Sequence, residues 1–92
     1  MNVEVLYFAE FKDITGKEKE DVELVNNSLK ELINILLSKY NIRNLLWDEK
    51  IQNIHNNISL IINNKAIHDK NPLLIELKEG DSIAFLTPVS GG

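Results

Sequence analysis

The stretch that decides the fold is residues 28–40, which read SLKELINILLSKY. Its apolar residues recur at spacings of three and four, which places them on one stripe of an amphipathic helix; they are Leu29, Leu32, Ile33, Leu36 and Tyr40. Ser28 and Glu31 match a capping box, in which the Ser28 hydroxyl accepts from the Glu31 amide and the Glu31 carboxylate reaches back. The pattern predicts one helix over residues 28–40, and its apolar stripe needs a second element to cover it.

Short runs on both sides of this helix alternate with the period of two that is typical of β-strands. The runs are residues 3–8, 20–25, 58–63 and 82–87, with a further short run around residues 66–67. The first two lie close in sequence, so we expect an antiparallel hairpin. The first and last runs can pair in the middle of the sheet. Residues 9–16 are expected to be a polar loop with a turn at Gly16, and residues 41–57 an irregular helical turn or a packed loop.

A lone helix beside several strands favours one sheet packed on one helix. We therefore expect an α+β protein with the β-grasp layout of ubiquitin: a mixed sheet of four to five strands on one main helix. A length of 92 residues allows one core only. We expect residues 1–88 to form a single domain and residues 89–92 a flexible Gly-Gly tail.

Composition excludes several classes of function. Lys and Arg number 10 against 14 Asp and Glu, a formal net charge of −4, which argues against a nucleic-acid partner. There are no cysteines, so disulfides, thiolate metal sites and a cysteine nucleophile are absent. No apolar run approaches the roughly 18–20 residues of a membrane span, and no signal peptide is visible. We expect a cytoplasmic protein without a membrane partner.

The body of the chain shows no catalytic constellation. His55 and His68 have no cysteine, second nearby histidine or other ligand spacing beside them, so we expect no metal site. There is no glycine-rich phosphate loop, and we expect no bound cofactor. Both histidines are expected to be surface or loop residues.

The C-terminus is the candidate reactive group. Gly91 and Gly92 follow the last predicted strand, a proline and a short polar linker. A tail without side chains fits a narrow channel that a Cβ would block. Its carboxylate is a poor electrophile and needs activation, for example as an acyl-adenylate made by a partner that uses ATP. The alternative is a frayed end with no role.

Strand alternation also predicts an apolar patch. If Val3, Val5 and Tyr7 face the helix, Leu6 and Phe8 face away from it. In the same way, Ala84 and Leu86 face outward when Ile83 and Phe85 face inward. With the first and last strands adjacent, Leu6, Phe8, Ala84 and Leu86 form an exposed patch beside the root of the tail, and Ile61 extends it. The alternative is that residues 9–16 or 41–57 cover this patch.

Several of these segments resemble the MoaD/ThiS sulfur-carrier family, and within it the small subunits of molybdopterin synthase. The resemblance rests on residues 3–10 (VEVLYFAE), 79–85 (EGDSIAF) and 88–92 (PVSGG), with weaker similarity at residues 46–49 and 61–65. It covers essentially the whole chain. The terminal Pro-Val-Ser-Gly-Gly is its most specific part.

The resemblance implies a non-catalytic sulfur carrier. An adenylating enzyme related to ubiquitin-activating enzymes would adenylate the Gly92 carboxylate using ATP, and a sulfurtransferase system would convert it to a thiocarboxylate. The tail would then enter the large subunit of molybdopterin synthase and donate sulfur for the molybdenum or tungsten cofactor. Gly92 would carry the sulfur and Gly91 would be the narrow neck; the partner contacts would be Phe8, Leu86, Pro88, Val89 and Ser90.

Other functions of the same tail stay open. The chain could serve thiamine thiazole synthesis or transfer RNA thiolation, or act as a ubiquitin-like modifier joined to lysines through Gly92. A β-grasp binding module with an inert tail is the remaining alternative.

Overall fold

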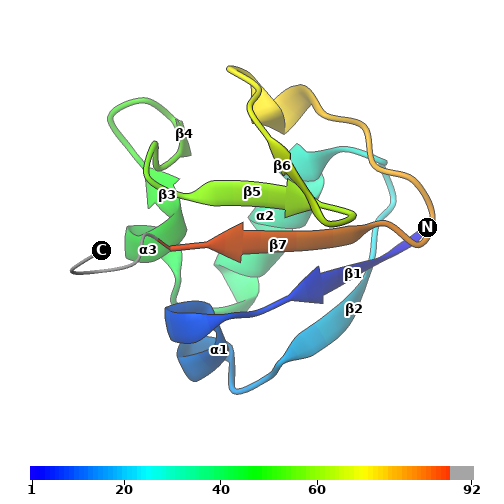
Figure 1. Ribbon diagram of the computed structural model, residues 1–92, viewed down its shortest axis with the longest axis horizontal. Coiled ribbons are helices and arrows are strands. Elements are labelled where there is room, and N and C mark those ends of the chain that lie inside the picture. The colour runs from blue at the N-terminus through cyan, green and yellow to red at the C-terminus, as the bar shows by residue number, and fades with distance from the viewer. Residues whose placement is uncertain (88–92) are drawn as a thin grey trace.

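The protein is a five-stranded mixed sheet with one main helix across one face (Figure 1). The structure, a computed structural model, describes residues 1–87. Its elements are β1 (Asn2–Leu6), α1 (Ala9–Thr15), β2 (Lys19–Glu23), α2 (Leu29–Lys39), α3 (Arg43–Leu46), β3 (Trp47–Asp48), β4 (Asn53–Ile54), β5 (Ser59–Ile62), β6 (Lys65–Ile67), the 3₁₀ turn η1 (Pro72–Leu74) and β7 (Ser82–Leu86). The predicted β-grasp fold class is confirmed.

The sheet order is β2-β1-β7-β5-β6, so the first and last strands are neighbours at its centre. β1 and β7 run parallel, with Val5 opposite Ile83 and Leu6 opposite Ala84. β1 pairs antiparallel with β2, as expected for a hairpin, and β7 pairs antiparallel with β5. The predicted central pairing is therefore confirmed, and the strand limits differ from the expected ones by one or two residues.

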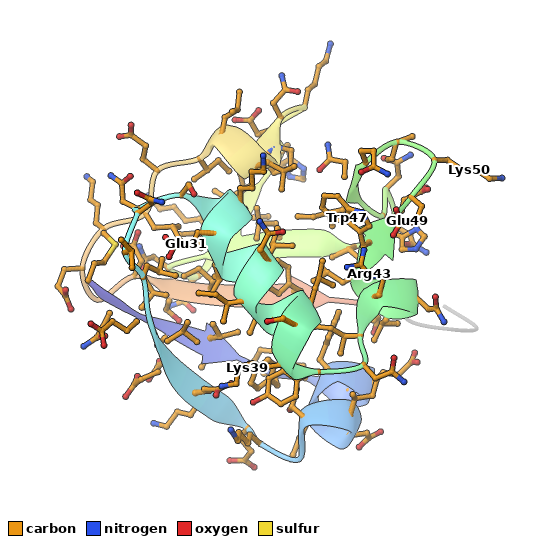
Figure 2. The ribbon with its side chains drawn as sticks, turned by 180° about the vertical axis from the view of Figure 1, so that it is seen from behind. Glu31, Lys39, Arg43, Trp47, Glu49 and Lys50 are labelled. Atoms are coloured by element: carbon orange, nitrogen blue, oxygen red, sulfur yellow. The ribbon has the colours of Figure 1, made fainter. Side chains whose placement is uncertain are left out.

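Helix α2 begins at the predicted cap. The Ser28 hydroxyl accepts from the Glu31 amide at 3.1 Å. The Glu31 carboxylate accepts from the amides of Val25 and Asn26, so it anchors the chain before the cap rather than the cap residue itself. Figure 2 shows α2 crossing the sheet from Glu31 near its start to Lys39 at its end. The apolar stripe of α2 is buried against the sheet through Leu29, Leu32, Ile33 and Leu36.

Residues 9–16 are not the loop that the sequence predicted. Residues Ala9–Thr15 form α1, which ends where Gly16 adopts a φ of +72°. Phe11 is buried and its ring lies 6.2 Å from that of Phe85, centroid to centroid. With seven residues and one buried side chain, α1 is too short to show a helical stripe in the sequence. It closes the end of the core beside the end of β1.

Residues 41–57 hold a short helix and a small hairpin instead of an irregular segment. α3 leads into β3, which pairs antiparallel with β4. Ile42, Leu46 and Ile54 are buried in the same core as α2. Elements this short leave little periodicity to recognise in a sequence.

No helix within residues 1–87 is long and apolar enough to cross a membrane.

Candidate functional site

The root of the tail lies where β1 and β7 end together. The two strands are parallel, so their carboxyl ends meet at one edge of the sheet (Figure 1). Thr87 follows β7 directly and is the last residue that the structure describes. Pro88 and the four predicted tail residues, Val89, Ser90, Gly91 and Gly92, lie outside the described residues, and their roles remain predictions. The division between a domain of residues 1–88 and a tail also remains a prediction.

The structure brings together the predicted apolar residues beside this root. Leu6 is opposite Ala84 in the β1–β7 pair, and Ala84 is opposite Ile61 in the β5–β7 pair. Side chains directly opposite in adjacent strands lie on the same face of a sheet. These residues, with Leu86 and Phe8, form what we call the tail-root patch. No helix covers this face of the sheet within the described residues, because α2 lies on the opposite face (Figure 1).

The members of the tail-root patch differ in exposure. Phe8 is 48% exposed, and Leu6, Ile61 and Leu86 are half-buried. Ala84 is only 4% exposed, so the expectation that it is an exposed partner contact is wrong in this respect. Ala84 lies on the predicted face, but its one methyl group lies between the longer side chains of Leu6 and Ile61. It forms the floor of the patch rather than its contact surface.

A shallow depression adjoins the patch at the junction of β1 and α1. Its lining consists of Leu6, Tyr7, Phe8, Ala9, Lys12, Glu18 and Lys19. Ala9 has a φ of +50°, in the left-handed region that favours glycine. An alanine there costs about 1 kcal/mol in backbone strain, and such strain clusters at ligand sites. The strained turn directs Phe8 outward while Phe11 enters the core.

A cluster around the Glu20 carboxylate joins the ends of β1 and α2 to the start of β2. Tyr7 and Tyr40 donate to Glu20 Oε1 at 2.8 and 2.7 Å, and Lys17 and Lys39 contact Oε2. Figure 2 shows Lys39 at the end of α2. The sequence reasoning did not identify this cluster, although two inward-facing tyrosines signal a need for hydrogen-bond partners.

The electrostatics of this cluster favour an ionised carboxylate. Burial raises the pKa of Glu20, but hydrogen bonds from Lys39, Tyr40, Tyr7 and Lys17 outweigh it and lower the pKa from 4.5 to about 2. Burial, followed by the hydrogen bond to Glu20, raises the pKa of Tyr7. The cluster therefore holds a fixed negative charge at neutral pH, and it acts as a structural clamp behind the tail-root patch.

Among residues 1–87, no group of three or more His, Asp and Glu side chains could hold a metal ion. His68 is exposed and His55 half-exposed, with its Nδ1 3.8 Å from Asp48 and its Nε2 3.1 Å from the Asn44 carbonyl oxygen. Within residues 1–87 the structure thus places an apolar patch beside the root of the predicted tail.

This fold and this surface define a ubiquitin-like β-grasp protein in which the described chain ends at Thr87, directly after the central strand β7 and beside an apolar patch. Comparison with known proteins gives the family. The model of the ThiS family matches residues 5–92, and the chain belongs to that family.

Individual relatives agree with this assignment. The molybdopterin synthase sulfur carrier subunit of Drosophila melanogaster is 29% identical, over 100% of this chain and 92% of the relative. A chain in the complex of subunits 1 and 2 of the molybdopterin-converting factor from Helicobacter pylori is 30% identical, with full coverage of both chains and a TM-score of 0.67. The small archaeal modifier protein 1 of Methanosarcina acetivorans is 28% identical, with a TM-score of 0.82 and coverage of 99% and 96%.

Proposed function

We propose that this chain is the sulfur carrier subunit of a molybdopterin synthase and that its Gly92 carboxylate becomes a thiocarboxylate. The observation that carries the proposal is the match to the ThiS family through residue 92, together with relatives named as sulfur carrier subunits that match over the whole of this chain. The position of the tail root supports it, because β7 delivers the tail beside an uncovered apolar patch.

The chemistry has three balanced stages. A carboxylate oxygen of Gly92 attacks the α-phosphate of ATP on an adenylating enzyme, and pyrophosphate leaves. A sulfurtransferase system then supplies the sulfur as a persulfide, which attacks the acyl-adenylate carbon, and AMP leaves. A thiol cleaves the S–S bond of the resulting acyl disulfide and is itself oxidised to a disulfide, which leaves one carboxylate oxygen of Gly92 replaced by sulfur.

Sulfur donation follows in the large synthase subunit: the thiocarboxylate sulfur attacks a carbon of the pterin precursor and displaces an oxygen group. Water then cleaves the acyl–sulfur bond, which leaves the sulfur on the pterin and returns Gly92 to its carboxylate. This chain supplies the carrier atom and the docking surface, whereas the catalytic groups and the ATP site belong to its partners.

The tail-root patch has a defined part in this proposal. Phe8, Leu6 and Leu86 provide apolar area for the partner, and Ala84 provides a flat floor between them. Pro88, Val89 and Ser90 contact the partner channel, and Gly91 keeps the neck narrow. All these partners operate in the cytoplasm, and neither nucleic acid nor membrane takes part.

A second function is favoured by one observation. The similarity to the Methanosarcina acetivorans small archaeal modifier protein 1, at 28% identity, supports a ubiquitin-like modifier joined to lysines through Gly92. Activation by adenylation is common to both functions, and they differ in the nucleophile that attacks the acyl-adenylate.

The test is to add one alanine after Gly92 and, as a matched control, one alanine before Met1. The purified chain is incubated with the adenylating enzyme, sulfurtransferase and synthase large subunit of the same organism, and sulfur transfer to the pterin precursor is measured. The C-terminal addition should abolish transfer and the N-terminal addition should not. Equal transfer by both variants would rule out Gly92 as the sulfur-bearing residue.

The acceptor is decided by two further measurements. Co-purification with a thiazole synthase instead of the synthase large subunit would favour thiamine thiazole synthesis. Isopeptide-linked Gly92 in digests of the source cells would establish the modifier role.

A further inference from the structure

The depression beside Phe8 is lined by both apolar and charged residues. Leu6, Phe8 and Ala9 provide apolar lining, and two lysines and one glutamate stand around them. Lys12 pairs with Glu18 at 3.2 Å, whereas Lys19 has no ion-pair partner within residues 1–87. The depression therefore has a net positive charge, although the whole chain has a formal net charge of −4.

Lys19 has a defined position relative to the tail-root patch. It is directly opposite Leu6 in the β1–β2 pair, and Leu6 is opposite Ala84 in the β1–β7 pair. Lys19, Leu6 and Ala84 thus form one row across the uncovered face of the sheet. A partner that contacts the patch over Leu6 also comes within reach of the Lys19 ammonium group.

The other charges of this face are acidic. Two residues further along the strands, Glu4 is directly opposite Asp21, and Glu23 continues the same face of β2. Like charges directly opposite in a sheet are unfavourable and repel a further anion. Lys19 is the one cation among the residues of β1 and β2 that face away from α2. On these two strands, a carboxylate of a binding partner can therefore form a favourable ion pair only at Lys19.

We propose that the depression beside Phe8 receives an apolar side chain of the synthase large subunit, and that a carboxylate next to this side chain pairs with Lys19. The inference rests on the proposed function, since it commits to that subunit as the occupant. The apolar contact supplies affinity, and the ion pair sets the orientation in which the tail enters the partner. The acidic pair of Glu4 and Asp21 disfavours the reversed orientation.

The test measures affinity by calorimetry between the full-length chain and the synthase large subunit of the same organism. Lys19→Glu is compared with Lys65→Glu, which makes the same charge change on an exposed residue of the opposite edge strand, β6. Lys19→Glu should weaken binding about tenfold and Lys65→Glu less than about twofold. Raising the salt concentration should weaken binding of the unaltered chain to the large subunit more than it weakens binding of the Lys19→Ala variant. Thermal unfolding of each variant verifies that it is folded.

Equal losses of affinity in Lys19→Glu and Lys65→Glu would overturn the inference and leave the proposed function intact. Absence of binding by the unaltered chain would overturn both. Binding that depends on Lys19, without any thiocarboxylate at Gly92, would retain the docking inference and reject the proposed chemistry.

Discussion

Leu6 of β1 and Ala84 of β7 are directly opposite each other in the parallel pair at the centre of the sheet. Because parallel strands end at the same edge, this pairing places the β1–α1 turn beside the end of β7, where the described chain stops at Thr87. In the function proposed above, a partner that binds the tail also contacts Phe8 and Leu6. Leu6 and Phe8 are far from Leu86 in sequence, and this one pairing brings them to the same end of the sheet.

Phe11→Ala should lower the free energy of unfolding by about 3–4 kcal/mol, because it removes a fully buried ring beside Phe85 and leaves a cavity. Ile14→Ala on the same helix is the control. Ile14 is 43% exposed, so its loss should cost less than about 1 kcal/mol. Urea unfolding measures the free energy of unfolding of both variants and of the unaltered chain. Similar losses would contradict the assignment of α1 as the cover for the end of the core.

Glu20→Gln should lower stability at neutral pH by about 1–2 kcal/mol, a modest figure because the lysines of the cluster are half-exposed and screened by water. The pKa of Glu20 is lowered in the folded state, from 4.5 to about 2. Its contribution is therefore present above pH 4.5 and is lost as the pH falls toward 2. Unfolding measured across this window should show a smaller acid dependence for Glu20→Gln than for Glu10→Gln. An unchanged acid dependence would exclude the clamp role.

Phe8→Ala should weaken binding of the synthase large subunit about tenfold or more, because aromatic side chains that enter a partner surface dominate such interfaces. Stability should change by less than about 1 kcal/mol, since half of the ring is already exposed. Leu74→Ala is the matched control, because Leu74 is 77% exposed in η1, away from the tail-root patch. Equal affinity of the Phe8 and Leu74 variants would remove Phe8 from the interface.

The sequence predicted the regular parts of this fold because their patterns are long enough to recognise. Helix α2 carries a full apolar stripe and a capping pair, and the central strands alternate cleanly. The central placement of β1 beside β7 followed from covering one helix with the available strands, whereas their parallel direction came from the structure. The outward-facing positions of Phe8 and Leu6 followed from the same alternation.

The remaining features depend on tertiary contacts that a linear pattern does not contain. Alternation indicated the face of Ala84, but its burial is set by the longer neighbours Leu6 and Ile61. The clamp joins Tyr7, Glu20 and Tyr40 from three elements, and only the packed structure brings them together. Lys19 becomes informative only once its register opposite Leu6 is known.

The central claim is that the C-terminal carboxylate of Gly92 carries the sulfur. The most direct measurement is mass spectrometry of the full-length chain after incubation with its adenylating enzyme, ATP and a sulfur source. The claim predicts a mass increase equal to the exchange of one oxygen for sulfur, located in the C-terminal peptide and abolished by alkaline hydrolysis. An unchanged C-terminal mass in the presence of an enzyme that releases pyrophosphate with this chain would contradict it.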